Sequence, residues 1–417
     1  MRVRLLAGVT AVTCAAAAWL SAPALAQQSG AQADPNSNNE EGQALVQYVQ
    51  DVIAGVNVPP DATLTWEPFF VKSEGNQVYV PFTVAIPEDA LEDEVNLYYA
   101  VVPKGPRMST FTANPKDGSD TLIEIAGEVT NTASTTVENV SLTVTMLDAN
   151  GLALSTNQAT VASVAAGQTA PFTVEVTEPE GTEQYSVMVD GSAPVFRDLS
   201  MRDLPNADSD DMVRVSRAFV APSGEYELIL VMREREPRNA ATPRRLALLR
   251  EDVTLPSFGD GLAISSIFVA RNIAVRPEAL DPDKQMEEPY TLGNMVIDPI
   301  TSAGPPSIRQ NGELSIIFFV YNAGFDAARK PNVEVQYNFH IKTNEGEQYF
   351  NRTNPQQFNA ETLPPEFDLT AGHQVVGGQS IPLASFEPGE YRLEMRVNDT
   401  LSGQSLTDNI PFIVLGS

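Results

Sequence analysis

The sequence predicts an all-β protein built from tandem immunoglobulin-like antiparallel β-sandwiches, with one short helix near the N-terminus. From about residue 60 onward, polar and apolar side chains alternate with a period of two, and Gly, Pro, Asn and Asp separate the alternating segments. In "VEVQYNFHI", residues 333–341, every second residue is apolar or aromatic and those between are polar. A strand of this kind packs one face inward and turns the other to water, as antiparallel sandwiches require.

Residues 1–26 are predicted to be a bacterial export signal that is cleaved near Ala26. Arg2 and Arg4 precede an apolar run, and the run ends in the small residues "ALA" of a cleavage site. As a membrane anchor the run is short and broken by a proline, and no second apolar span of about 20 residues follows. We therefore expect a periplasmic or secreted protein without a transmembrane span.

Residues 27–58 are predicted to form a polar linker followed by a short amphipathic helix. The stretch "QQSGAQADPNSNNEEGQ" has no apolar period, which is typical of a flexible segment. In the next stretch the apolar residues fall on one helical face: Leu45, Tyr48, Val49, Val52, Ile53 and Val56. We expect this face to dock on the neighbouring domain, and a helix that binds a partner protein is the alternative.

One phrase occurs twice in the β region. "PSGEYELILVMRE" stands at 222–234 and "EPGEYRLEMRVND" at 387–399. In each copy a glycine turn leads into a strand that begins with a tyrosine, Tyr226 or Tyr391. This arrangement predicts the tyrosine corner of immunoglobulin-like sandwiches, in which the hydroxyl bonds back to the backbone of the turn. An ordinary core tyrosine is the alternative.

A second pair of similar segments organises the domains. "GEVTNTASTTVENVSLTVTMLDANG" at 127–151 matches "FFVYNAGFDAARKPNVEVQYNFHIKTNEG" at 318–346 in its order of strand, Asn-centred bend, "NV" strand entry and glycine turn. The earlier copy continues into a further strand and could fold by itself, so we expect it to be inserted into a discontinuous first domain. The predicted division is a first β-sandwich at 59–118 plus 195–256, an inserted immunoglobulin-like module at 119–194, and a C-terminal β-sandwich at 257–417.

Several of these segments resemble known bacterial families. "PSGEYELILVMRE", "LAISSIFVAR", "GELSIIFFVYNAG" and "FEPGEYRLEMRVNDTLSGQSLTDNIPFIV" resemble the C-terminal β-rich region of exported von Willebrand factor A-related and GWxTD-motif proteins, over about 195–417. The segment at about 119–194 resembles an FxLYD module, although "TMLDANG" stands where the aromatic motif of that family would be. The resemblance implies exported β modules. It supplies no catalytic residue.

The charge of the chain limits its partners. The full sequence has a formal net charge of −28, and removing Arg2 and Arg4 with the signal makes it −30. Nucleic acid is therefore excluded as an expected partner, and a basic or cation-bridged protein or cell-surface polymer is favoured. The single cysteine, Cys14, lies in the signal, so the mature chain has no disulfide and depends on buried cores for its stability.

The sequence contains few groups arranged for chemistry. "DGSDT" at 117–121 is the nearest match to the D-x-S-x-S metal site of von Willebrand type A domains, but its surroundings predict a turn between strands. His340 and His373 have no ligand-spaced neighbours and are expected at the surface. The acidic stretch "NADSDD" at 206–211 predicts a solvated loop, with calcium bound by Asp208, Asp210 and Asp211 as the alternative. We predict no catalytic, cofactor-binding or metal-binding residue.

The function predicted from these observations is that of an exported, non-enzymatic protein of the bacterial cell envelope that binds or scaffolds another macromolecule. A carbohydrate-binding module is one alternative, and it would need an aromatic platform from Trp66, Tyr98 or Tyr99. A hydrolase with a pair of carboxylates is a less favoured alternative, because such pairs are recognised by their separation in space.

Overall fold

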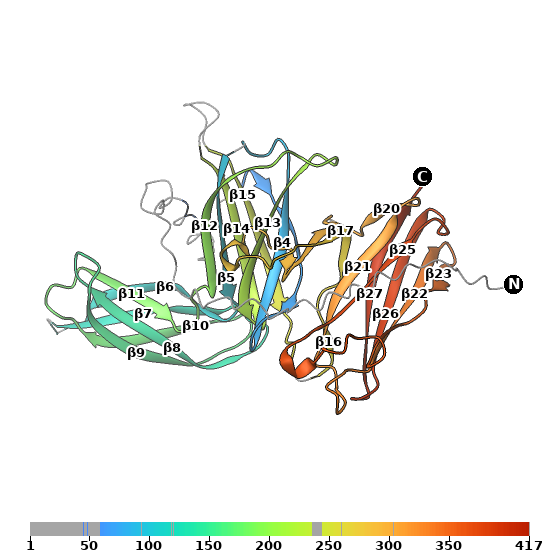
Figure 1. Ribbon diagram of the computed structural model, residues 1–417. Helices are drawn as coiled ribbons and strands as arrows, with labels where there is room; N and C mark the ends of the chain where they lie inside the picture. The colour runs from blue at the N-terminus through green and yellow to red at the C-terminus, as the bar shows by residue number, and fades with distance from the viewer. Residues whose placement is uncertain are drawn as a thin grey trace.

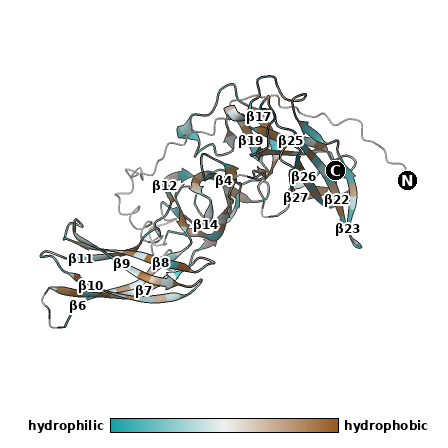
Figure 2. Cartoon of the chain, turned by 90° about the horizontal axis from the view of Figure 1, so that it is seen from below, coloured by the Kyte–Doolittle hydropathy of each residue, from teal (hydrophilic) through white to brown (hydrophobic). Residues whose placement is uncertain are grey.

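The computed structural model describes Leu45, Tyr48 and residues 59–416, apart from 93, 118, 120, 236–243, 260 and 303. The described chain folds into three antiparallel β-sandwiches, which confirms the predicted all-β class. Figure 1 shows the first sandwich in the centre, the inserted module projecting to the left and the C-terminal sandwich on the right. In Figure 2 the strands carry the hydrophobic residues of each sandwich.

The first sandwich is built from two stretches of chain that flank the inserted module. Its larger sheet, called the β14 sheet, has the order β1 (Ala62–Thr63), β15 (Leu246–Leu255), β14 (Gly224–Glu234), β5 (Glu94–Pro103) and β12 (Phe196–Asp203). The β4 sheet has the order β13 (Met212–Pro222), β4 (Gln77–Pro87) and β2 (Thr65–Pro68), with β3 (Val71–Lys72) also paired to β4. β5 and β12 pair directly, although the whole module lies between them in the sequence.

The central strand β14 is buried on both faces. Leu228 and Leu230 lie in the core between the two sheets. Ile229 and Val231 point the other way and pack in a separate cluster with Leu45. Leu45 belongs to the predicted N-terminal helix, of which only Leu45 and Tyr48 are among the described residues, and both are helical. The side chain of Leu45 is completely buried, so Leu45 covers part of the outer face of the β14 sheet.

The inserted module is a sandwich of two three-stranded sheets. The β7 sheet has the order β10 (Thr169–Thr177), β7 (Leu122–Asn131) and β6 (Pro106–Pro115), and the β8 sheet has the order β11 (Gln184–Val189), β8 (Val137–Leu147) and β9 (Ala153–Val164). The sequence interpretation assigned β6 to the first sandwich, but β6 pairs along its length with β7. The module therefore begins before residue 119, because β6 is an edge strand of its sheet.

A buried charged group joins the module to the first sandwich. The guanidinium of Arg107 on β6 donates to the carboxylate of Glu227 on β14 at 2.7 Å and to the carbonyl of Pro103 at 3.1 Å. Arg250 on β15 donates to the other oxygen of Glu227 at 2.5 Å. Burial alone raises the pKa of Glu227, but the hydrogen bonds from Arg250 and Arg107 outweigh it and hold this pKa below its ordinary value.

The C-terminal sandwich also has two sheets. The β21 sheet has the order β16 (Ala263–Ile264), β21 (Glu313–Tyr321), β17 (Phe268–Val275), β19 (Met295–Pro299) and β18 (Thr291–Leu292), with β25 (Val375–Pro382) also paired to β21. The β26 sheet has the order β20 (Ser307–Arg309), β27 (Gln404–Leu415), β26 (Gly389–Asp399), β22 (Val333–Thr343) and β23 (Gly346–Arg352), with β24 (Gln356–Phe358) also paired to β22. Two short 3₁₀ turns, η1 (Pro282–Lys284) and η2 (Leu369–Ala371), lie in its connections.

The first and C-terminal sandwiches share one hydrophobic core. Ile316 and Phe318 of β21 face the interior of the C-terminal sandwich. Ile317 and Phe319 face the opposite way and belong to the cluster that fills the first sandwich. Both faces of β21 are therefore buried, which accounts for its nearly continuous apolar sequence, "LSIIFFVY".

Ring stacking and hydroxyl hydrogen bonds fix this interface. The rings of Phe69 and Phe268 stack with centroids 4.5 Å apart and planes inclined by 10°. The hydroxyl of Tyr79 on the outer face of β4 donates to the carbonyl of Pro289 at 2.7 Å. The hydroxyls of Thr83 and Tyr290 lie 2.8 Å apart. Tyr79 and Tyr290 are buried, and burial raises the pKa of both phenols far above the ordinary value, so both remain neutral hydrogen-bonding groups.

Both predicted tyrosine corners are present. The hydroxyl of Tyr226 donates to the carbonyl of Pro222 at 2.9 Å, and that of Tyr391 donates to the carbonyl of Glu387 at 2.9 Å. Each hydroxyl reaches four residues back, across the turn that precedes its strand. The repeated phrase therefore encodes the same corner in the first and in the C-terminal sandwich.

The predicted signal at residues 1–26 and most of the segment 27–58 lie outside the described residues. Within the described part of the chain, no helix has the length and apolar character that crossing a membrane requires.

Candidate interaction site at the junction of two sandwiches

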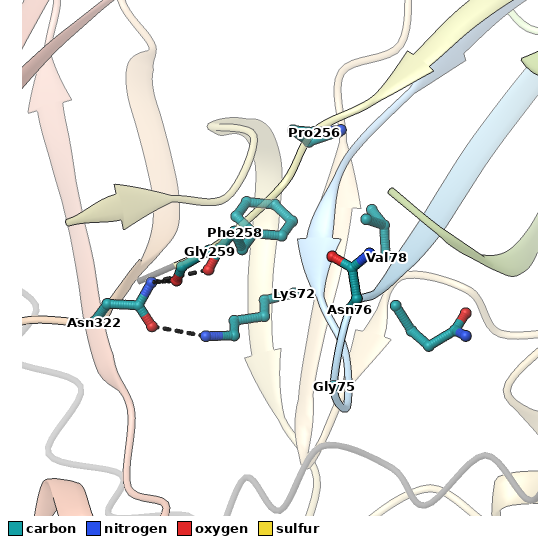
Figure 3. A pocket seen from close by; sticks show the side chains of 9 residues that line it. Lys72, Gly75, Asn76, Val78, Pro256, Phe258, Gly259 and Asn322 are labelled. Carbon is teal, nitrogen blue, oxygen red and sulfur yellow. Dashed lines mark hydrogen bonds between the residues drawn. The ribbon is translucent and has the colours of Figure 1, made fainter. Parts of the chain in front are cut away.

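A small open cavity lies where the first sandwich meets the C-terminal sandwich (Figure 3). Its volume is about 180 Å³. The hairpin between β3 and β4, the connection that follows β15 and the end of β21 contribute its walls, which are formed by Lys72, Gly75, Asn76, Gln77, Val78, Pro256, Phe258, Gly259 and Asn322. None of these side chains is a carboxylate, an imidazole, a thiol or a hydroxyl.

Asn322 organises the cavity. Its backbone has a φ of 57°, in the left-handed region that asparagine tolerates better than most residues. This conformation turns the side-chain amide toward the connection between the sandwiches, where the nitrogen donates to the carbonyls of Phe258 at 2.9 Å, Gly261 at 2.8 Å and Gly259. The amide oxygen accepts from the ammonium of Lys72 at 2.7 Å. One side chain thus links β21, the connection and the β3–β4 hairpin.

Lys72 is the cationic group of the cavity. Its ammonium lies 5.9 Å from the centre of the Tyr321 ring, and its backbone N–H donates to the Tyr321 hydroxyl at 3.2 Å. Asn322 accepts only one of the three ammonium hydrogen bonds that a lysine can donate. The cavity can therefore offer donors to a carbonyl or carboxylate of a partner.

Exposed apolar side chains lie on the loops beside the cavity. Phe325, three residues after Asn322, is 55% exposed, and Leu401 in the β26–β27 loop is 45% exposed. The two loops contact each other, because the backbone N–H of Gly324 donates to the buried carboxylate of Asp399 at 2.6 Å. We call the cavity together with Phe325 and Leu401 the junction site.

The aromatic residues considered for a sugar platform lie elsewhere. Tyr99 has no exposed surface, and its hydroxyl donates to the carbonyl of Ala218 at 2.8 Å. Tyr98 is 7% exposed and packs in the cluster that contains Leu45. Trp66 is partly buried, edge-on to Phe82 at 5.9 Å. The expectation that Tyr98 and Tyr99 could form a platform is wrong, because β5 is an inner strand covered on both faces.

Two of the three aspartates in the acidic loop at 206–211 pair with an arginine of the same chain. The guanidinium of Arg214 donates to Asp208 at 2.6 Å and to both oxygens of Asp210 at 2.9 and 2.6 Å. These hydrogen bonds lower the pKa of Asp210 below its ordinary value. Among the described residues, no group of three or more acidic, histidine or cysteine side chains is arranged to hold a metal ion. The guanidinium of Arg214 therefore takes the position next to Asp208 and Asp210 that a bound calcium ion would need.

The two histidines take part in local packing. His340 is only 18% exposed in its side chain, its ring meets Tyr349 edge-on at 5.9 Å, and its nitrogens lie 3.8 Å from Glu347 and 3.9 Å from Glu394. His373 accepts a hydrogen bond from the backbone of Asp368 at 3.1 Å. Both residues are less exposed than the sequence interpretation expected.

The described residues of "DGSDT", which are Asp117, Ser119 and Thr121, lie in a turn between strands, where the backbone N–H of Ser119 donates to the carbonyl of Lys116 at 3.1 Å. The turn connects β6 and β7, and the hydroxyl of Ser119 accepts from the backbone N–H groups of Thr121 at 3.3 Å and Leu122 at 3.0 Å. The side chain of Ser119 is thus committed to closing the turn. Sequence reasoning singled out the bend at Asn322, but it did not find Lys72, because the two residues lie on different sandwiches and meet only in the folded protein.

No protein-family model and no curated protein matches the chain. Among solved structures, the chain is similar to a β-galactosidase from Bacteroides fragilis with 10% identity, 84% of this chain and 34% of that chain covered, and a TM-score of 0.18. It is also similar to red sea bream transglutaminase, with 8% identity and a TM-score of 0.13. That match covers 74% of this chain and 31% of the transglutaminase chain. A third match is E. coli alpha-2-macroglobulin in its native conformation, with 10% identity, 77% and 20% covered, and a TM-score of 0.18. The chain spans about a third or less of each of these chains.

Proposed function

We propose that this chain is an exported, non-enzymatic scaffold of the bacterial cell envelope that binds a protein or a cell-surface polymer through the junction site. The observation that carries this proposal is the contrast between the sheets and the loops. The broad faces of β14, β4 and β21 are already covered by other parts of the same chain, whereas the loops at the junction present Phe325 and Leu401 to solvent. Exposed apolar side chains beside polar groups are typical of interaction sites.

The shared core supports this role because it holds the two walls of the junction site in fixed positions. Lys72 belongs to the first sandwich and Asn322 to the C-terminal sandwich, and a partner bound between them would contact both. A rigid, preorganised site loses less conformational entropy on binding than a mobile one. The predicted signal at residues 1–26 supports export, and a cavity lining without a carboxylate, imidazole, thiol or hydroxyl side chain supports binding without turnover.

The charge of the chain indicates the partner class. A net charge of −28 favours a partner that is basic or bridged by cations, and screening by salt weakens long-range attraction of this kind. The apolar contacts of Phe325 and Leu401 are much less sensitive to salt. We therefore expect salt to slow association while leaving a salt-resistant fraction of the affinity.

Cross-linking in the native envelope tests the proposal. The protein is cross-linked in cells, the captured partner is identified by mass spectrometry, and its recovery is compared between the parent and Phe325→Ser. Val275→Ser is a matched control, since Val275 is 54% exposed on β17, away from the loops of the junction site. We expect loss of the cross-link only in Phe325→Ser. Equal recovery from both variants would show that the partner does not bind at the junction site. If the protein hydrolysed a polysaccharide or peptide and lost this activity when one carboxylate was replaced, it would be an enzyme and not a binding protein.

A further inference from the structure

The inserted module exposes four edge strands, and three of them are protected against pairing with another chain. β6 begins at Pro106, ends at Pro115 and has a register shift between Met108 and Thr110. β10 contains Pro171 and the charged Glu175. β11 has only six residues. Proline, charge, irregular register and short length are the features by which natural proteins keep sheet edges from associating.

The fourth edge strand, β9, has one irregularity at its start, where the pairing with β8 shifts register between Ala153 and Ser155, and none of these protections from Ser155 onward. It is 12 residues long, and within the described chain it pairs only with β8. It contains no proline and no charged residue. Its alternating pattern keeps Val161 buried while Thr156, Gln158 and Thr160 are exposed. Every second N–H and C=O group of β9 therefore points away from β8, along an edge about 40 Å long at about 3.3 Å per residue.

Other edges of the described chain differ from β9. β12 carries Arg197, Asp198, Arg202 and Asp203, and β23 carries Glu347 and Arg352. β25 lacks charge, but it ends in Pro382, and its Gly378 N–H donates to the side chain of Gln356 on β24 at 3.3 Å, so β24 covers part of this edge. From Ser155 onward, β9 is thus a regular edge without the protections found on these strands.

The distribution of charge indicates what pairs with β9. The sequence from Ala149 to Val174 contains no Asp, Glu, Lys, Arg or His, although the whole chain carries a net charge of −28. Two copies of so acidic a chain repel each other over most of their surfaces. They can approach most closely where charge is absent, and the β9 edge lies within that uncharged stretch.

We propose that β9 pairs antiparallel with β9 of a second copy of this chain, around a two-fold axis, so that the two β8 sheets become one continuous sheet. An antiparallel pair of identical strands is self-complementary and satisfies both free edges at once. An axis perpendicular to the sheet keeps the exposed side chains of both copies on the same face. Threonine side chains such as Thr156 and Thr160 then meet across the new pair, which is a favourable cross-strand contact. This proposal is independent of the junction site.

Sedimentation and single-cysteine cross-linking test the pairing. Sedimentation velocity of the mature protein is measured over a range of protein and salt concentrations. We expect a monomer–dimer equilibrium that shifts toward the dimer as salt rises, because salt screens the repulsion between the acidic copies. In the mature chain, which lacks Cys14, Thr156→Cys, Gln158→Cys and Thr160→Cys are then oxidised one at a time. Disulfide-linked dimer should be greatest at the position nearest the two-fold axis and fall on either side of it.

A charged substitution provides the matched control. Gln158→Lys, midway between Thr156 and Thr160, places like charges beside each other across the β9 pair and should weaken dimerisation by about tenfold. Thr112→Lys introduces the same charge on the exposed side of β6 in the same module and should have no effect. Circular dichroism confirms that each variant is folded. A monomer at all concentrations and salts, equal effects of the two substitutions, or a monomer that takes up an extended peptide along β9 would overturn the pairing of two copies.

Discussion

The phenol of Tyr391 donates a hydrogen bond of 2.9 Å to the carbonyl of Glu387 and closes the corner from which β26 starts. Its ring also stacks on Phe412, with centroids 5.4 Å apart. The hydroxyl and the ring are therefore separate contributions to stability. We expect Tyr391→Phe to lower the free energy of unfolding by about 1 kcal/mol, since it removes only the hydrogen bond. Tyr391→Ala, which also removes the ring, should cost about 3–5 kcal/mol.

Urea unfolding monitored by fluorescence measures both changes. Tyr226→Phe is the parallel test in the first sandwich, where the hydroxyl donates to Pro222 at the same distance, and a similar loss is expected. If both phenylalanine variants were as stable as the parent, the corner would contribute through packing alone.

The shared core predicts that the first and C-terminal sandwiches unfold together. Phe69 is 6% exposed and stacks on Phe268 across the interface. Phe69→Ala should cost about 3–5 kcal/mol and divide the single thermal transition into two, because it removes one of the two rings that stack across the interface. Differential scanning calorimetry detects the division. Phe386→Ala, inside the C-terminal sandwich, should also destabilise the protein while leaving the two sandwiches coupled. A division of equal extent in both variants would contradict the coupling role of Phe69.

A fragment that contains only residues 257–417 provides a related test. The sequence contains a full set of strands there and suggests an independent unit, but in the whole chain Ile317, Phe319 and Tyr321 of β21 face the first sandwich. The isolated fragment would expose this apolar face to water. We expect it to self-associate and to bind a hydrophobic dye, as exposed apolar patches do. A monomeric fragment with cooperative unfolding and no dye binding would show that the face is stable without its cover.

The lowered pKa of Glu227 makes the attachment of the module sensitive to acid. Because the folded-state pKa lies below the ordinary value of 4.5, the carboxylate stabilises the folded protein above about pH 4.5, and this contribution is lost as the pH falls through the folded-state pKa. Glu227→Gln should cost about 3 kcal/mol at neutral pH, since it leaves Arg107 buried without its charged partner. The difference from the parent should shrink as the pH falls below 4.5, as measured by urea unfolding at each pH.

A surface ion pair is the control for this measurement. Glu94 is 56% exposed in its side chain and pairs with Arg235 at 2.6 Å. Glu94→Gln should change stability by less than about 1 kcal/mol, because exposed pairs are solvated and screened. A pH-independent loss in Glu227→Gln would show that shape and hydrogen bonding at this position matter more than charge.

The left-handed backbone of Asn322 predicts which of two variants at this position is the more stable. Asn322→Ala removes the amide that binds the connection at 258–261, and it also places an ordinary Cβ in a strained conformation at a φ of 57°. Asn322→Gly removes the same amide without that strain. We expect the alanine variant to be less stable than the glycine variant by about 1 kcal/mol in urea unfolding. The reverse order would mean that the conformation of residue 322 changes in the variants.

The strands and both tyrosine corners could be predicted from the sequence, because period-two alternation and the glycine turn with its tyrosine are local signals. The burial of both faces of β5 and β21 could not be predicted from the sequence. Tyr98 and Tyr99 stand in an apolar run, and the residues that bury them, such as Leu45 for Tyr98 and Phe219 for Tyr99, lie far away in the sequence. An alternating pattern shows that one face of a strand is buried, but it does not show what covers the other face.

The junction site and the start of the module were missed for the same reason. Lys72 and Asn322 meet only because two sandwiches pack together, and the bend at Asn322 gives no local sign of Lys72. β6 is polar on its exposed face and has prolines at both ends, so its segment reads as a loop, and only its pairing with β7 identifies it as a strand of the module.

The direct pairing of β5 with β12 means that the module stands in the place of a hairpin turn. The two strands that carry it into and out of the first sandwich are neighbours, and the backbone N–H of Val195 already donates to the carbonyl of Val101 at 2.9 Å. A turn of a few residues could join their ends without moving either strand. The fold of the first sandwich therefore does not depend on which domain is inserted between β5 and β12. That domain could be exchanged, lengthened or deleted during evolution without a change in the central β-sheet.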